Sequence, residues 1–162
     1  MDWRSLRAAC RGDAPDIAAA RTLELLEITT FPTPVIDIVV DLGVHVRLES
    51  GPGMEGGLQW SDPPTVFINS LNSSTRRRFT CAHEIGHLIM HPMSENYIDE
   101  SSPGGRETRI LEQQANRFAA HLLMPVWKLE AVVLHYGKNI QASTDYFGVS
   151  ATALNWQLDL LR

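Results

Sequence analysis

Residues 76–91 read RRRFTCAHEIGHLIMH, and within this stretch His83 to His87 form the pattern H-E-x-x-H. Residues four apart lie on the same face of a helix, so both imidazoles can reach one zinc ion. Glu84 lies about 100° further round the helix, where it can reach a water molecule held by the metal. The spacing therefore predicts a helix that holds zinc between His83 and His87, with Glu84 placed as a general base.

The residues around this motif are apolar on nearly every side of the helix. Two stripes run along it, formed by Phe79, Ala82, Gly86 and Met90 and by Cys81, Ile85 and Leu88. Such a helix is expected to be central and buried. The alternative to a metal site is a core in which His83, Glu84 and His87 each have their own hydrogen-bond partners. That alternative requires three sets of partners, because an unpaired polar or charged group costs several kcal/mol to bury.

The whole chain has the size and composition of one soluble globular domain. It contains 162 residues, of which 44% are hydrophobic and 20% charged, and this length is enough to bury a proper core. We see no signal peptide and no apolar run long enough for a membrane helix, so we expect the protein to be located in the cytoplasm. Cys10 and Cys81 are too few for a disulfide framework, and Cys81 is expected to be a small buried hydrophobe. The net charge of −5 gives no reason to expect nucleic-acid binding by bulk electrostatics.

Hydrophobic periodicity predicts an α+β fold, with a mainly helical core, a small three-stranded antiparallel sheet and a C-terminal helix-turn-helix-like appendage. The first expected helices cover residues 16–27, capped by Asp16, and residues 35–42, ended by Gly43. The expected strands cover residues 44–48, 58–60 and 65–69. The glycine-rich residues 49–57 are expected to form a loop. An edge of this sheet could hold an extended peptide.

Polar residues with a possible structural or functional role lie at the start of the motif helix and in the segment after it. The candidate caps are Asn72, Ser73 and Ser74. Three arginines, Arg76, Arg77 and Arg78, follow where the helix dipole disfavours cations. We interpret these arginines as solvated or locally paired charges, and the alternative is that they dock an acidic partner. Residues 92–105 are loop-like, and Tyr97 in them is a candidate for polarising a substrate carbonyl.

A catalytic zinc site has three protein ligands, so a third ligand is needed. His91 is excluded because it lies eight residues from His83, about 12 Å along a helix. The glycine turn that a metzincin places between its second and third histidines is absent, and we interpret His91 as a second-turn or helix-end residue.

Glu112 is the better candidate for the third ligand. It lies in the strongly helical residues 107–123 and shares a face with Asn116, four residues on. If Glu112 binds the metal, Asn116 can accept a hydrogen bond from the far nitrogen of a ligand histidine and set its tautomer. His121 lies half a revolution away and should not reach the same ion. Spacing alone leaves open that Glu112 is an exposed helix charge.

Two motifs together resemble the ImmA/IrrE family of metallopeptidases. They are RFTCAHEIGH at residues 78–87 and EQQANRFAAHLLMP at residues 112–125, and the similarity extends over about residues 34–161, including FGVS at 147–150. The resemblance implies a zincin-like core and a gluzincin-like zinc site formed by His83, His87 and Glu112. It also implies that Glu84 is the catalytic acid/base. No position of these motifs is visibly lost, so an active enzyme is expected.

The resemblance further implies a substrate class. Members of the family cleave helix-turn-helix repressors, of the XRE type, that are encoded nearby, and this derepresses mobile-element or stress-response genes. The expected function is therefore that of a zinc-dependent endopeptidase with a repressor as its protein substrate. Two alternatives remain open: a zinc-stabilised regulator that sequesters a repressor without cutting it, and a DNA-binding protein that uses its C-terminal helices.

The C-terminal residues predict a helical pair behind the peptidase core. We divide the chain into a metallopeptidase core at residues 1–136 and a helix-turn-helix-like pair at 137–162 that packs on it. The expected helices cover residues 126–136, 140–147 and 151–161, with a turn at 148–150. No lysine or arginine lies between Ser150 and Leu161, and only Asn155 and Gln157 could read bases, so nucleic-acid binding is not expected. Trp156 and Leu160 are expected in the core, although an exposed pair would suit a partner.

Overall fold

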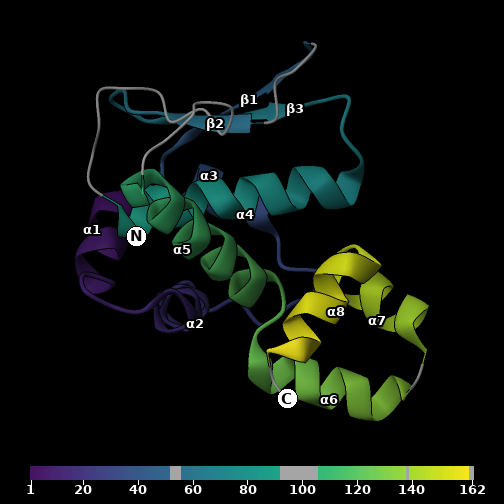
Figure 1. The fold of residues 1–162 in the computed structure, drawn as a ribbon. Helices are drawn as coiled ribbons and strands as arrows, with labels where there is room; N and C mark the ends of the chain where they lie inside the picture. The colour runs from purple at the N-terminus through teal and green to yellow at the C-terminus, as the bar shows by residue number, and fades with distance from the viewer. Residues whose placement is uncertain (52–55, 92–105, 138, 161–162) are drawn as a thin grey trace.

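The computed structural model describes residues 1–51, 56–91, 106–137 and 139–160. The elements in these residues are α1 (Trp3–Ala9), α2 (Pro15–Leu25), α3 (Val35–Asp41), β1 (His45–Glu49), β2 (Gly56–Gln59), β3 (Thr65–Asn69), α4 (Ser74–Met90), α5 (Arg106–Leu123), α6 (Val126–Tyr136), α7 (Ile140–Phe147) and α8 (Ala151–Asp159). The sheet lies over one side of α4, while α5 and α2 lie on another side and α6 to α8 gather beyond the end of α5 (Figure 1). The predicted mainly helical α+β fold with three strands is confirmed.

The sheet is mixed, so the prediction of an entirely antiparallel sheet was wrong. Its strand order is β1-β3-β2, with β2 antiparallel to β3 and β1 parallel to β3. The prediction assumed that successive strands pair with each other. Instead the chain passes from β1 to the far edge and returns through the middle of the sheet, which makes the first and last strands run the same way.

Strand β2 begins within the residues that were predicted to form a loop. Its Gly56 pairs with Ile68 of β3 and packs directly on Thr80 of α4, where any side chain would collide. Glycine is unfavourable in a strand unless another part of the chain approaches closely, as α4 does here. The glycine therefore marks a contact between sheet and helix.

Helix α4 is the buried centre that the apolar stripes predicted. Every residue from 80 to 89 is buried, and α4 contacts α1, α2, α3, α5, β2 and β3. Of the three candidate caps, Ser73 takes this role, because its side chain accepts a hydrogen bond from the backbone N–H of Arg76. His91 is the C-terminal cap residue, as expected.

The N-terminal part of the chain departs from the prediction. Helix α1 was not predicted; Asp2 caps it, and it buries Trp3 and Leu6. Asp16 does not cap α2, because the helix starts one residue earlier at Pro15 and Asp16 lies in its first turn. Proline suits the first helical position, where no backbone N–H is needed.

The C-terminal helices have the predicted turn but a different buried face. Gly148 has a left-handed conformation with a φ of +64°, and the Ser150 side chain caps α8 by accepting from the N–H of Ala153. Trp156 and Leu160 are 47% and 49% exposed, so the prediction that they lie in the core was wrong.

The buried residues of α8 are Leu154 and Gln157. Leu154 and Gln157 are three residues apart and share the buried face of the helix, so the side chain of Trp156 lies on a different face. The division of the chain at residues 136 and 137 stays a prediction.

Arg78 ties α4 to the turn before α8. Its guanidinium donates hydrogen bonds to the backbone oxygens of Gly148 (3.1 Å), Thr33 (2.9 Å) and Phe147 (3.3 Å). Burial lowers the pKa of this guanidinium, and hydrogen bonds to three carbonyl oxygens satisfy the group that is removed from water. The interpretation of Arg78 as a locally paired charge is confirmed.

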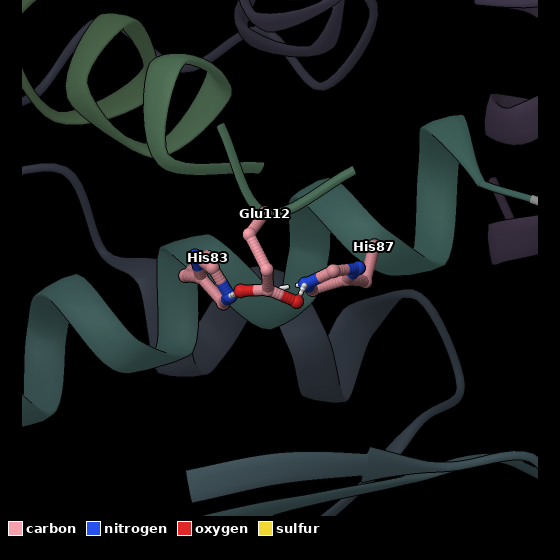
Figure 2. Close-up of side chains that lie close together, drawn as sticks. All are labelled: His83, His87 and Glu112. Atoms are coloured by element: carbon pink, nitrogen blue, oxygen red, sulfur yellow. Dashed lines mark hydrogen bonds and ion pairs between the residues drawn. The ribbon is translucent and has the colours of Figure 1, made fainter. Parts of the chain in front are cut away.

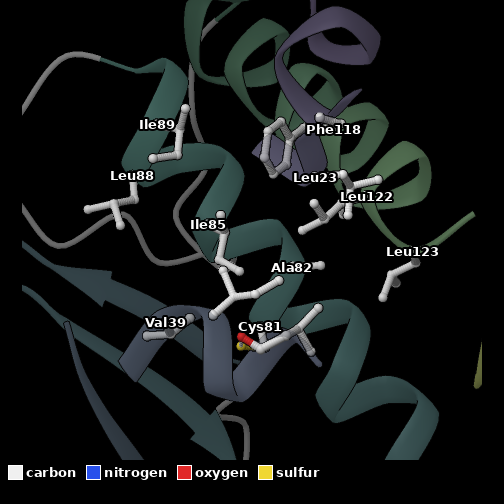
Figure 3. Packing of buried hydrophobic residues seen from close by; sticks show 14 of the residues in the cluster. Leu23, Val39, Cys81, Ala82, Ile85, Leu88, Ile89, Phe118, Leu122 and Leu123 are labelled. Atoms are coloured by element: carbon white, nitrogen blue, oxygen red, sulfur yellow. Dashed lines mark hydrogen bonds between the residues drawn. The ribbon is translucent and has the colours of Figure 1, made fainter. Parts of the chain in front are cut away.

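Helices α4 and α5 approach each other closely at Gly86. A methyl group at this position would lie 3.1 Å from the Phe118 ring, 3.2 Å from the Ala115 Cα atom and 3.3 Å from the Ala115 oxygen. Around this contact, side chains from α2, α3, α4 and α5 pack into one apolar cluster (Figure 3). The absence of a side chain at Gly86 thus sets the spacing of the two helices.

Within the described part of the chain, no single helix is long and apolar enough to cross a membrane; the bent pair formed by residues 108–123 and 126–136 meets the length and composition criteria only when taken together.

We expect Gly86→Ala to reduce the free energy of unfolding by about 1 kcal/mol or more. Crowding against α5 costs about 1–3 kcal/mol, and the better helix propensity of alanine returns up to about 1 kcal/mol. Chemical denaturation followed by circular dichroism measures the change. Gly51→Ala is the control, because a methyl group there meets no atom of the described residues within 4 Å. Equal stability of the two variants would show that the α4–α5 contact tolerates the extra atom.

Candidate metal centre

The side chains of His83, His87 and Glu112 converge between α4 and α5 (Figure 2). Glu112 Oε2 lies 3.2 Å from His83 Nε2, and Glu112 Oε1 lies 3.2 Å from His87 Nε2. The two Nε2 atoms are 3.0 Å apart. One potential ligand atom from each residue lies within 4.8 Å of the others. The alternative of Glu112 as a remote, exposed helix charge is therefore wrong.

This arrangement suits a cation with one open coordination position. Both histidine side chains are 1% exposed, whereas the Glu112 side chain is 22% exposed, so the cluster is buried but reaches solvent on the side of α5. Two imidazole nitrogens and a carboxylate that face one another supply three lone-pair donors with no competing cationic side chain in the described cluster. Catalytic zinc sites use this donor set and leave a fourth position for water or substrate.

The Glu112 carboxylate is held in its ionised form. Burial alone would raise its pKa, but hydrogen bonds from His83 and His87, when their Nε2 atoms carry a proton, outweigh burial and hold the pKa of Glu112 well below its usual range; a bound cation takes the place of those protons. A carboxylate that stays ionised is available as a metal ligand at any physiological pH.

Asn116 orients the ring of His83. Asn116 Oδ1 lies 2.9 Å from His83 Nδ1 and accepts its hydrogen bond. A proton on Nδ1 leaves the lone pair of Nε2 directed at the cluster, which is the state that metal binding needs. The structure thus brings Asn116 to the place that its spacing from Glu112 predicted.

His91 and Gln114 orient the ring of His87, and neither was predicted to do so. His91 Nδ1 lies 2.8 Å from His87 Nδ1, and His91 Nε2 lies 3.1 Å from Gln114 Oε1. The Gln114 oxygen can only accept, so the proton of His91 is on Nε2 and its Nδ1 accepts from His87. Burial and the nearby His87 ring lower the pKa of His91 to about 4, so this ring is neutral at pH 7.

The expectation that His91 is not a metal ligand agrees with its contacts, because its two nitrogens are engaged by His87 and Gln114. The spacing of four between His87 and His91 could have suggested a ring-to-ring contact. No local pattern could have indicated Gln114, which is 23 residues further along the chain.

Glu84 lies on α4 next to His83 and is 2% exposed. Burial, followed by the charge of Glu84, raises the pKa of the Cys81 thiol to about 12. Cys81 is therefore a protonated, buried side chain, as predicted. The role of Glu84 as a general base stays a prediction.

The remaining candidates lie away from the cluster or outside the described residues. His121 Nδ1 lies 3.3 Å from Gln157 Nε2 of α8, consistent with the expectation that it does not join the cluster. His45 is exposed on β1, as predicted. Tyr97 and residues 92–105 lie outside the part of the chain that the structure describes.

Residues 40–159 match the family of IrrE N-terminal-like domains, which is classed among the peptidases. The match covers most of the chain and includes every residue of the cluster. The chain therefore belongs to this family, and the resemblance seen in its two motifs is confirmed.

Individual relatives support the same assignment. The chain is 34% identical to uncharacterized immunity region protein 2 of Bacillus phage phi105 over 89 residues, which are 52% of this chain and 49% of that protein. It is 28% identical over 123 residues to the radiation response metalloprotease IrrE of Deinococcus radiodurans, covering 69% of this chain and 37% of the relative. The chain thus spans half or less of the length of these relatives.

A solved structure shares the fold. A Mycobacterium tuberculosis transcriptional regulator superimposes with a TM-score of 0.67 at 17% identity, over 98% of this chain and 52% of that protein. At this identity the likeness concerns the fold alone.

His91→Phe should weaken zinc binding about 10- to 100-fold, because phenylalanine keeps the ring volume but removes the acceptor that orients His87. Competition with a chromophoric chelator measures the affinity. His45→Phe, at an exposed position of β1, is the control and should bind zinc as the unchanged protein does. An equal affinity of both variants would exclude an orienting role for His91.

Proposed function

We propose that this protein is a zinc-dependent endopeptidase. The observation that carries the proposal is the convergence of His83, His87 and Glu112 from two helices in a family that is classed among the peptidases. Two imidazoles and one carboxylate form the donor set of hydrolytic zinc sites such as that of thermolysin. Two relatives carry the name metalloprotease, which supports hydrolysis as the reaction.

In the proposed reaction, Glu84 moves the proton. Zinc, when bound, would supply Lewis-acid chemistry that polarises the scissile carbonyl and makes a water molecule more acidic. Glu84 accepts a proton from the attacking water, whose oxygen bonds to the carbonyl carbon, and delivers that proton to the amine nitrogen as the C–N bond breaks. Asn116 and His91 keep the two histidine rings in the orientation that directs Nε2 into the site.

The sheet offers a place for an extended substrate. Strand β2 is an edge of the sheet and contacts α4, the helix that carries both histidines. An extended peptide can add to the edge of a sheet through backbone hydrogen bonds. We therefore place the substrate backbone along β2, with its scissile bond next to the metal.

The proposed substrate is a helix-turn-helix repressor of the XRE type, and its cleavage would derepress mobile-element or stress-response genes in the cytoplasm. A phage relative that is named for an immunity region supports a link to repression. In this proposal residues 1–136 form the catalytic core, and residues 137–162 form a helical pair that packs on it.

A DNA-binding role for the C-terminal helices is less well supported. Helix α8 (Ala151–Asp159) contains no lysine or arginine, and the whole chain has a net charge of −5. Affinity for DNA comes mainly from neutralising phosphates with such side chains. A regulator that only sequesters a repressor stays the main alternative.

Glu84→Gln is expected to keep the fold and the zinc content while it reduces turnover about a hundredfold or more, because glutamine cannot accept the proton of water. The assay follows fragments of the repressor encoded beside this gene by gel electrophoresis and mass spectrometry. Glu130→Gln, an exposed position of α6, is the matched control and should cut at the normal rate. Normal cutting by Glu84→Gln would exclude its role as base.

Glu112→Ala should lower the zinc content of the purified protein, since only two ligands would remain. Metal analysis by mass spectrometry gives the stoichiometry, and a chelator should abolish fragment formation by the unchanged protein. An unchanged stoichiometry in Glu112→Ala would point to a different third ligand. A repressor that binds but is never cut would favour the sequestering alternative.

A further inference from the structure

A groove of about 840 Å³ lies where the start of α4, the middle of α5 and the start of α8 meet. Each of these helices and the turn before α8 contribute apolar residues to its lining, which are Phe79, Ala120, Val149, Ala153 and Trp156. The volume lies within the range of about 300–1,000 Å³ that is usual for ligand pockets. Among the residues of the groove, the proposed reaction uses only Asn116.

Several polar side chains of the lining are already engaged within the protein. Ser73 and Ser150 accept hydrogen bonds from backbone N–H groups in the first turns of α4 and α8. Asn116 accepts a hydrogen bond from His83, and Arg76 also has a partner within the protein. A ligand in the groove therefore gains its binding free energy mainly from the apolar part of the lining.

The apolar part combines a buried surface with an exposed ring. Ala120 and Val149 are 3% and 6% exposed, and Val149 belongs to the main apolar cluster. Trp156 is 47% exposed and lines the same groove. A large aromatic surface thus stays in water beside side chains that water barely reaches. An apolar side chain that entered the groove would remove this surface from water, which is favourable.

The groove adjoins the candidate metal centre at His83. Two of its lining residues, Phe79 and Asn116, both contact that histidine. The ring centroids of Phe79 and His83 are 6.4 Å apart, and Asn116 Oδ1 lies 2.9 Å from His83 Nδ1. A peptide whose scissile bond lies at the metal centre therefore has the neighbouring side chains within reach of the groove.

Hydrogen bonds hold the walls of the groove in place. Arg78 of α4 donates to the backbone oxygens of Phe147 and Gly148 in front of α8. The buried Gln157 of α8 donates to the backbone oxygen of Met124 at 3.3 Å, just beyond the end of α5. Helix α8 is thereby fixed to both neighbours, and a preformed pocket loses little entropy when it takes up a ligand.

We propose that this groove is a specificity pocket, which takes a large apolar side chain of the substrate from the segment next to the scissile bond. In this inference Trp156 and Phe79 provide the rings against which that side chain packs. The inference rests on the proposed function, because the occupant belongs to the protein that the metal centre cuts. It adds a selection rule for the substrate: a large apolar residue at a fixed position beside the cut bond.

A nucleic acid and a second copy of this chain are the less favoured occupants. Helix α8 offers no lysine or arginine to phosphates, and a phosphate backbone gains little from an apolar lining. A second copy would cover Trp156 from outside, but the adjoining metal centre would then be obstructed for a protein substrate. Each of these occupants predicts a distinct result in the test below.

The test measures binding of two fluorescent peptides to the full chain by anisotropy. Both are uncharged repeats of about 12 residues, Ser-Leu-Gln and Ser-Ala-Gln, and they differ only in the size of the apolar side chain. We expect the leucine peptide to bind at least about tenfold more tightly, with an affinity that does not fall as salt is raised. Trp156→Ala should weaken binding of the leucine peptide about tenfold.

Trp127→Ala is the matched control, because Trp127 is 57% exposed on α6 and does not line the groove. It makes the same change as Trp156→Ala and should leave the affinity for the leucine peptide unchanged. Equal binding of the two peptides, or equal effects of the two variants, would overturn the proposal. So would binding that is lost at high salt, which indicates a charged ligand, or a dimer in sedimentation that Trp156→Ala dissociates.

A second readout locates the pocket relative to the cut bond. The zinc-loaded protein is incubated with peptides of mixed sequence, and mass spectrometry identifies the bonds that are cut. We expect a large apolar residue at one fixed position beside these bonds, and Trp156→Ala should remove this preference. Cutting with no such preference would overturn the pocket alone.

The binding assay needs no turnover, so the pocket and the peptidase assignment can fail separately. Preferential binding of the leucine peptide without any cutting, of either the peptides or the repressor, would contradict the peptidase assignment. The groove would then remain a binding site for apolar peptides.

Discussion

The close contact between α4 and α5 at Gly86 is the constraint on which the site depends. Because no side chain separates the two backbones there, α5 comes near enough for Glu112 to meet the histidine pair of α4. The ten buried residues of α4 fix this helix in the core. A ligand set assembled from two rigid, buried helices needs little rearrangement to take up a metal ion, and preorganisation of this kind favours catalysis.

Helix α5 supplies more than one ligand to the site. It carries Glu112, and it also carries Asn116 and Gln114, which act on His83 directly and on His87 through His91. Each histidine therefore has one nitrogen engaged by a hydrogen bond and the other directed at Glu112. The ring orientations that a metal requires are thus built into the same helix contact that forms the core.

The C-terminal helices are attached to the start of the motif helix. Arg78, at the start of α4, binds the backbone of the turn before α8, so the motif helix and the C-terminal pair are held together. Trp156 is 47% exposed and lines a groove between the start of α4, the middle of α5 and the start of α8. The matched regions cover 49% and 37% of the length of two relatives, and the fold covers 52% of a Mycobacterium tuberculosis transcriptional regulator, so this fold also occurs as part of a longer chain.

The sequence by itself determined the features that follow from local periodicity. The spacing of four that places His83 with His87 and Glu112 with Asn116 is a property of any helix, and polar residues before the apolar runs mark where α4 and α8 begin. Only the tertiary structure decided the parallel pairing of β1 with β3, the contact of His91 with Gln114, and which face of α8 is buried. These depend on how segments far apart in the chain pack together, and side-chain spacing within one element contains no information about its neighbours.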